Sequence, residues 1–153
     1  MNLRFATLPL LVMTVLIAPM MGGCQAKKYT YSLTLRNAST EPLMVGFAKE
    51  GPPFEDAWAT PEQVARIPAR PDERAWGVPV EPGKTAEVKT VTAKLEPTSI
   101  AYVRVYASTP TLEGMLAIST GSPNRADVQL LPGANDLIVV RQNGRLVVQR
   151  MKQ

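Results

Sequence analysis

Few side chains in this chain of 153 residues could perform chemistry, because it contains no histidine and only one cysteine, Cys24. The absence of histidine excludes Ser-His-Asp and Cys-His nucleophiles and removes the commonest zinc ligand. The remaining candidates are acidic residues of one proline-rich segment: Glu55, Asp56, Asp72 and Glu73. They could form a glycosidase-type acid–base pair or bind calcium, although their spacing does not match an EF-hand loop. Arginines share the segment, so a solvated loop with ion pairs is the simpler interpretation, and we expect no enzymatic activity, cofactor or metal.

Three aromatic residues of the same segment, Phe54, Trp58 and Trp76, are candidates for a binding surface. Tryptophan is enriched at recognition surfaces because its ring combines a large apolar face with one hydrogen-bond donor. Such a surface would bind sugar rings or a protein partner. Alternatively, the rings fix the long segment to the body of the domain, since tryptophan is mostly buried in proteins. The first interpretation predicts exposed indole rings and the second predicts buried ones.

Cys24 follows a segment that has the plan of a secretory signal. A positive charge at Arg4 is followed by an uncharged, largely apolar run over residues 5–23, which ends in small residues before the cysteine. The junction "MGGC", residues 21–24, resembles the lipobox of bacterial lipoproteins, in which an apolar residue and then small residues precede the cysteine. Neither a disulfide partner nor a histidine competes for this thiol.

The resemblance implies that residues 1–23 are a signal peptide and that cleavage falls between Gly23 and Cys24. The Cys24 sulfur would then carry diacylglycerol, and its new amino group would be acylated. This implies a lipid-anchored protein of the cell envelope. In a cell with two membranes it implies the outer membrane, because Gln25 stands where an aspartate commonly signals inner-membrane retention. An uncleaved transmembrane anchor and an ordinary secretory signal are the alternatives, although prolines in the run disfavour a regular spanning helix.

In this interpretation residues 24–28 form a lipidated tether, and a domain of residues 29–153 follows. Five peptide steps from Cys24 to Tyr29 span only about 18 Å when fully extended, so the domain would lie close to the bilayer. Lys27 and Lys28 could attract anionic head groups or could simply be solvated. Besides the bilayer, we consider an envelope protein or a polysaccharide as a partner. The 17 basic and 13 acidic residues are scattered along the chain, which gives no support to nucleic acid binding.

Alternation of apolar and polar residues predicts β-strands over most of the domain. "YTYSLTLR", residues 29–36, and "LMVGFA", residues 43–48, are predicted to pair as a hairpin. In "SIAYVRVYA", the side chains of Tyr102, Arg104 and Tyr106 are expected on one face and the small apolar residues on the other. Further strands are predicted in "TAEVKTVTAKL", "GMLAIST" and "ADVQLL".

The segment over residues 49–77 interrupts this pattern and is expected to be a long insert. Within it, "TPEQVAR" predicts a short helix with Thr60 as the N-cap and Gln63 at the capping-box position. After the insert, "EPGK", residues 81–84, has the sequence of a type II turn, with glycine at the corner that needs a positive φ.

The C-terminal segment "DLIVVRQNGRLVVQRM" predicts a hairpin with a type I′ turn at Asn143-Gly144, which would place Val140 opposite Val147. Short strands, frequent turns and one minor helix indicate an all-β, antiparallel β-sandwich, immunoglobulin-like or transthyretin-like. A small closed β-barrel is the alternative. We expect a non-enzymatic binding or structural domain; a sugar-binding module and, less favoured, a hydrolase that uses carboxylates alone are the other hypotheses.

Overall fold

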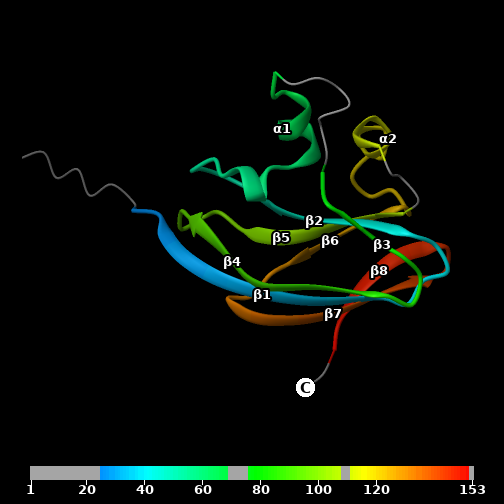
Figure 1. Cartoon of the computed structure of the whole chain (residues 1–153). Coiled ribbons are helices and arrows are strands. Elements are labelled where there is room, and N and C mark those ends of the chain that lie inside the picture. Colours follow the sequence, from blue (N-terminus) through cyan, green and yellow to red (C-terminus); the bar gives the residue numbers. More distant parts are fainter. Residues whose placement is uncertain (1–24, 69–75, 108–110, 152–153) are drawn as a thin grey trace, which may run out of the picture.

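Two four-stranded sheets form the body of the protein in the computed structural model, which describes residues 25–68, 76–107 and 111–151 (Figure 1). The first sheet has the order β4-β1-β7-β8 and the second the order β3-β2-β5-β6. The strands of the first sheet are β1 (Lys27–Asn37), β4 (Thr85–Leu95), β7 (Gly133–Gln142) and β8 (Arg145–Arg150). Those of the second are β2 (Leu43–Lys49), β3 (Val78–Val80), β5 (Ala101–Ala107) and β6 (Arg125–Gln129). The short helices are η1 (Asp56–Trp58), α1 (Pro61–Ala65) and α2 (Leu112–Leu116).

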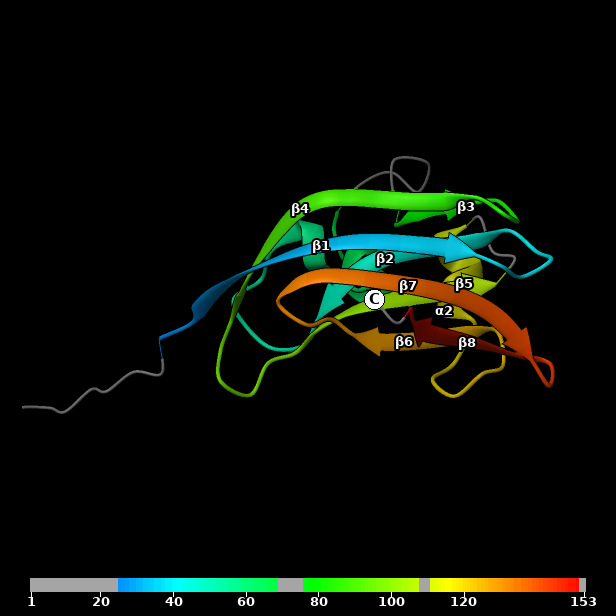
Figure 2. The ribbon, with the colours of Figure 1, turned by 90° about the horizontal axis from the view of Figure 1, so that it is seen from below.

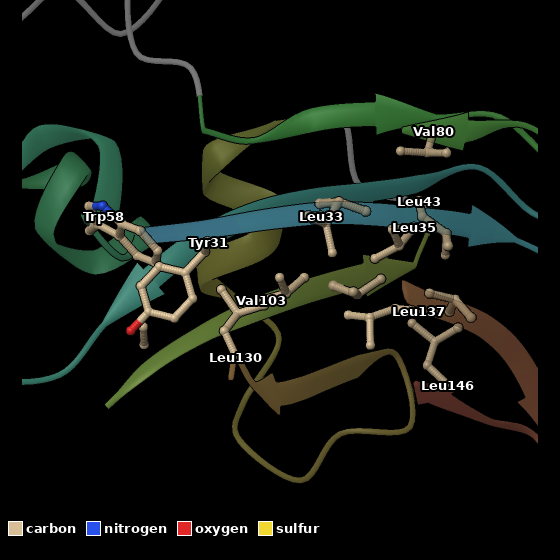
Figure 3. Packing of buried hydrophobic residues seen from close by; sticks show 14 of the residues in the cluster. Tyr31, Leu33, Leu35, Leu43, Trp58, Val80, Val103, Leu130, Leu137 and Leu146 are labelled. Atoms are coloured by element: carbon tan, nitrogen blue, oxygen red, sulfur yellow. The ribbon is translucent and has the colours of Figure 1, made fainter. Parts of the chain in front are cut away.

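The core lies between the inner faces of the two sheets (Figure 3). Strand β1 alternates as its sequence predicts, so that Tyr31, Leu33 and Leu35 are all buried while the residues between them are more exposed. They pack with side chains from both sheets, among them Val103 of β5 and Leu137 of β7. The predicted β-sandwich is therefore confirmed, and the closed-barrel alternative is wrong for the described part of the chain.

The predicted hairpin of the first two strands is wrong, because β1 and β2 belong to different sheets. Strand β1 pairs with β4 in antiparallel and with β7 in parallel orientation, whereas β2 pairs with β3 and β5. The chain crosses between the sheets after Asn37, which is buried. The side-chain amide of Asn37 donates hydrogen bonds to the backbone carbonyls of Glu41 (2.9 Å) and of Val80 in β3 (2.8 Å). Alternation shows that one face of each strand is buried, but strands on opposite sides of a core show the same pattern.

The strand predicted over residues 114–120 is also wrong, because part of this run forms helix α2. The side chain of Thr111 caps the helix by accepting a hydrogen bond from the amide of Gly114 (3.2 Å). Met115 is buried beneath the helix in a second apolar cluster with Trp76 and Tyr106. A short apolar run fits a buried strand or a buried helix equally well, and here the cap and the packing of Met115 favour the helix.

The C-terminal hairpin has the predicted register, with Gln142 opposite Arg145 and Val140 opposite Val147. Its turn residues, Asn143 and Gly144, have φ angles of 50° and 76°. Both values are positive, as a type I′ turn requires. The turn at residues 81–84 also forms, with a φ of 75° at its glycine.

The two ends of the sandwich differ in what they carry. At one end β1 begins, β4 ends and β7 begins, with Lys27 opposite Leu95 and Tyr31 opposite Gly133. In the second sheet β2 ends, β5 begins and β6 ends at this same end. Figure 2 shows it as the end from which β1 starts. We call it the entry end; it comprises the start of β1 and the connections β2–η1, β4–β5 and β6–β7.

Candidate functional site

Trp58 lies in the core of the sandwich. Helix η1 directs its ring inward, where 1% of the residue is exposed, and its Nε1 donates a hydrogen bond to the carbonyl of Thr92 in β4 (2.7 Å). The ring meets Tyr31 edge-on at 5.4 Å and Phe47 at 5.3 Å between centroids. Figure 3 shows Trp58 and Tyr31 side by side. The indole thus fixes the insert to both sheets.

Trp76 is also buried, with 6% exposure, but on the outer face of the second sheet. Its Nε1 donates a hydrogen bond to the carbonyl of Ala59 (2.8 Å), and its ring meets Tyr106 edge-on at 5.6 Å. The ring lies directly over Gly46 in β2, where a Cβ atom would come within 2.7 Å of it. Only glycine leaves enough room for the indole at this position.

The predicted aromatic binding surface is therefore wrong for its two tryptophans. Phe54 is exposed by 56%, but Trp58 and Trp76 are both buried and belong to separate apolar clusters. Tryptophan is well suited to fixing a long insert because a buried indole can bury much apolar area and still satisfy its single donor. The interpretation that these rings hold the segment to the domain is the one that the structure supports.

The acidic residues of the insert form no converging acid pair in the described part of the chain. Glu55 makes an ion pair with the buried Lys49 and accepts a hydrogen bond from the amide of Lys94 (2.9 Å). Burial favours a higher pKa for Glu55, but these hydrogen bonds and the charges of both lysines outweigh it and hold the pKa below its ordinary value. An ionised, paired carboxylate does not suit the role of a general acid.

The other predicted acidic candidates give no site either. Asp56 is exposed at the start of η1, and Asp72 and Glu73 lie outside the described residues. Within the described ranges, no three His, Cys, Asp or Glu side chains are grouped so that they could hold a metal ion.

A polar cluster around Arg104 on the outer face of the second sheet is a feature that the sequence did not reveal. Arg104 is buried, and its Nε donates a hydrogen bond to Asp127 of β6 (2.9 Å). Its other nitrogens reach Glu62 of α1 (3.4 Å) and the hydroxyl of Tyr102 (3.1 Å). Because two carboxylates already face its charge, Arg104 serves to fix α1 on the sheet and is not an open anion-binding group.

The tyrosines beside Arg104 are buried as well. Burial raises the pKa of both Tyr102 and Tyr106, and the charge of Arg104 opposes that effect. All seven residues of β5 are buried, since one face meets the core and helices α1 and α2 lie over the other (Figure 1). Alternation predicted the two faces of β5 correctly but could not show that its polar face is covered.

The entry end carries an open recess of about 200 Å³ and several exposed apolar side chains. The recess is lined by residues of both sheets and their connections, including Tyr29, Leu95, Pro97, Ile100, Leu130 and Pro132. Ile100 is exposed by 37% and Leu131, in the next connection, by 53%. Phe54, in the β2–η1 loop, is the third exposed apolar residue at this end.

Strand β1 begins two residues earlier than predicted. Lys27 and Lys28, expected in the tether, are strand residues and pair with Leu95 and Lys94 of β4. Gly23 and Cys24 lie outside the described residues, so the lipidation of Cys24 stays a prediction. None of the helices in the described part of the chain is long and apolar enough to cross a membrane.

Comparison of the sequence with protein-family models gives no match, and no curated protein matches it either. The chain's own features that bear on function are the cysteine-containing N-terminal pattern, the paired carboxylates, and the entry end next to the start of β1.

Proposed function

We propose that the protein is a lipid-anchored, non-enzymatic domain of the cell envelope, attached to the membrane through acylated Cys24. The lipobox-like sequence before Cys24 is the starting point. The observation that carries the proposal further is the start of β1 at Lys27, only three peptide steps beyond the cysteine. Three steps span about 11 Å when fully extended, so the anchor would hold the entry end against the bilayer.

A binding or structural function is supported by the way in which the charged groups are used. Two acidic residues of the insert are paired: Glu55 with Lys49, and Glu62 with the buried Arg104, which also faces Asp127. Such groups stabilise the fold and leave no reactive centre at these positions. A sugar-binding module built on the two tryptophans is not proposed, because both indoles are buried.

The anchor is tested by substituting Cys24→Ser in the full chain and following the protein in membrane and soluble fractions. We expect the parent protein in the membrane fraction, with diacylglycerol detected by mass on its Cys24 peptide. The variant should keep an uncleaved or altered N-terminus or leave the membrane. Gln25→Ser is the matched control, because it changes the adjacent residue and leaves the cysteine in place. A Cys24→Ser protein that fractionates with membranes at the parent's processed mass contradicts the proposal.

The same cells test the location within the envelope. If sorting depends on the residue after the cysteine, Gln25→Asp should move the protein from the outer to the inner membrane of a cell with two membranes. An unchanged distribution would show that Gln25 does not determine the location.

A further inference from the structure

We propose that the entry end is a membrane-docking surface, on which Phe54, Ile100 and Leu131 enter the lipid head-group region. This inference rests on the proposed function, since the lipid anchor would bring this end to the bilayer. It goes further because it assigns the lipid surface as a second ligand of the folded domain itself, bound by side chains more than twenty residues from Cys24 in the sequence.

The three apolar side chains come from the three connections of the entry end. Phe54 lies in the β2–η1 loop, Ile100 in the β4–β5 turn and Leu131 in the β6–β7 turn, and they are exposed by 56%, 37% and 53%. Single exposed hydrophobic residues are common on protein surfaces. One on each connection at the same end is a pattern that such scatter does not explain.

Hydrogen bonds join these connections into one rim. The amide of Glu50 donates to the carbonyl of Ile100 (3.0 Å), which ties the β2–η1 loop to the β4–β5 turn. The amide of Leu130 donates to the carbonyl of Ala101 (2.8 Å), which ties the β6–β7 turn to the same place. The three side chains are therefore presented on a fixed backbone, so that docking orders few residues.

The opposite end of the sandwich provides an internal comparison. Its fully described connections are residues 38–42, 81–84, 117–124 and 143–144, with the sequences "ASTEP", "EPGK", "AISTGSPN" and "NG". None of the exposed large hydrophobic residues in the described part of the chain lies in these turns. Two ends of one domain that are built from similar turns thus differ in apolar exposure, and the apolar end is the one next to the start of β1.

Charge on the β1–β4 flank of the entry end favours a lipid surface over a neutral partner. Lys27, Lys28 and Lys94 are exposed, and Lys28 stands directly opposite Lys94 in the strand register. Like charges in such a pair repel each other, and anionic phosphates would relieve that repulsion. Glu50, Glu55 and Glu96 carry the opposing charge at this end; Glu55 makes its ion pair with the buried Lys49, and it also feels the charge of Lys94.

A nitroxide spin label attached to the complete, lipidated protein tests whether the entry end lies in the lipid head-group region. Leu131→Cys and Phe54→Cys place a thiol at the entry end, and Thr40→Cys places one in an exposed turn at the opposite end. Each variant carries a nitroxide and is reconstituted in vesicles of equal parts phosphatidylethanolamine and phosphatidylglycerol without other proteins. The measurement is the collision of the nitroxide with a water-soluble nickel chelate. Unchanged circular dichroism of each variant shows that it is folded.

We expect the labels at 131 and 54 to be about tenfold less accessible to the chelate than the label at 40, as befits side chains in the head-group region. This protection should persist when the protein is diluted about tenfold in lipid, because no second copy is involved. Equal accessibility of the three labels would overturn the proposal. Protection that disappears on dilution would also overturn it, by showing that two copies cover each other.

The mass of the Cys24 peptide from the same samples separates the two proposals. If Cys24 carries a lipid but the three labels are equally accessible, the anchor is supported and the docking surface is refuted. If Cys24 carries no lipid, the anchor fails, and the labels are measured again in a Cys24→Ser background. If the labels at 131 and 54 are protected in this background, the domain docks without the anchor. If they are not protected, the docking surface is refuted.

Discussion

The packing of Trp76 over Gly46 gives a direct test of whether the insert's tryptophans support the fold or face a ligand. A Cβ atom on Gly46 would lie 2.7, 2.8 and 2.9 Å from three atoms of the indole. The ring is held from the other side by its hydrogen bond to Ala59 and by Tyr106, so it has little freedom to move. We therefore predict that Gly46→Ala destabilises the domain.

The size of the effect follows from two opposing terms. Overpacking by one methyl group in a well-packed cluster costs about 1–3 kcal/mol. Replacing glycine by alanine returns about 0.4–1 kcal/mol, because the unfolded chain has less freedom to lose. From the central values of these two terms the net loss should be about 1.3 kcal/mol, which lowers the urea midpoint by about 0.65 M if the denaturant slope is near 2 kcal/mol/M.

Urea unfolding followed by circular dichroism measures this loss, and the variant Trp76→Phe provides the control. Alone, Trp76→Phe should cost about 1–3 kcal/mol, because it removes the bond to the Ala59 carbonyl. The smaller ring also lacks the atoms that the new methyl group would strike. The double variant should therefore be more stable than the sum of the single effects predicts, by about 0.5–2 kcal/mol. A neutral Gly46→Ala and strictly additive effects would refute this packing and return Trp76 to the candidates for a binding surface.

Two further predictions concern the buried charges. Because the pKa of Glu55 is lowered by folding, its ionisation stabilises the folded state above about pH 4.3, and this stabilisation is lost as the pH falls through the lower folded pKa. Glu55→Gln should thus flatten the acid side of a stability-against-pH curve relative to the parent protein. A parent and variant with identical curves would contradict the ion pair. Arg104→Met should cost about 2 kcal/mol in urea unfolding, since the partly exposed Glu62 loses its ion pair and Asp127 keeps just one of its two cations, Arg125. The control Arg36→Met removes an exposed arginine of β1 and should change stability little. If the two substitutions have equal effects, Arg104 does not fix α1 on the sheet.

Local signals in the sequence predicted local structure well. Thr60 and Gln63 form the expected capping box at the start of α1. Asn143-Gly144 fixes the C-terminal register, because only a two-residue turn with positive φ fits between the two strands. In both cases the atoms that determine the structure lie within a few residues of one another, so the local sequence is enough to predict it.

Features that depend on distant contacts could not be predicted in the same way. Glu62 and Arg104 meet across 42 residues, and nothing in either segment indicates the other. The same holds for the sheet to which each strand belongs: β1 takes β4 and β7 as neighbours and leaves β2 to the other sheet. The burial of Trp58 and Trp76 likewise depends on how the insert returns to the domain, which composition alone does not determine.

The position of β1 suits the attachment that we propose. Because β1 lies between β4 and β7, it pairs with β4 over residues 27–36 and with β7 over residues 31–37. A pull on the tether would act along this strand and would load many hydrogen bonds of two ladders at once, whereas an edge strand has only one ladder to resist it. An anchored domain whose chain enters through a central strand therefore resists unravelling from its attachment point. The side chains of the entry end would then have to meet whatever surface the anchor reaches, which is why their apolar character bears on function.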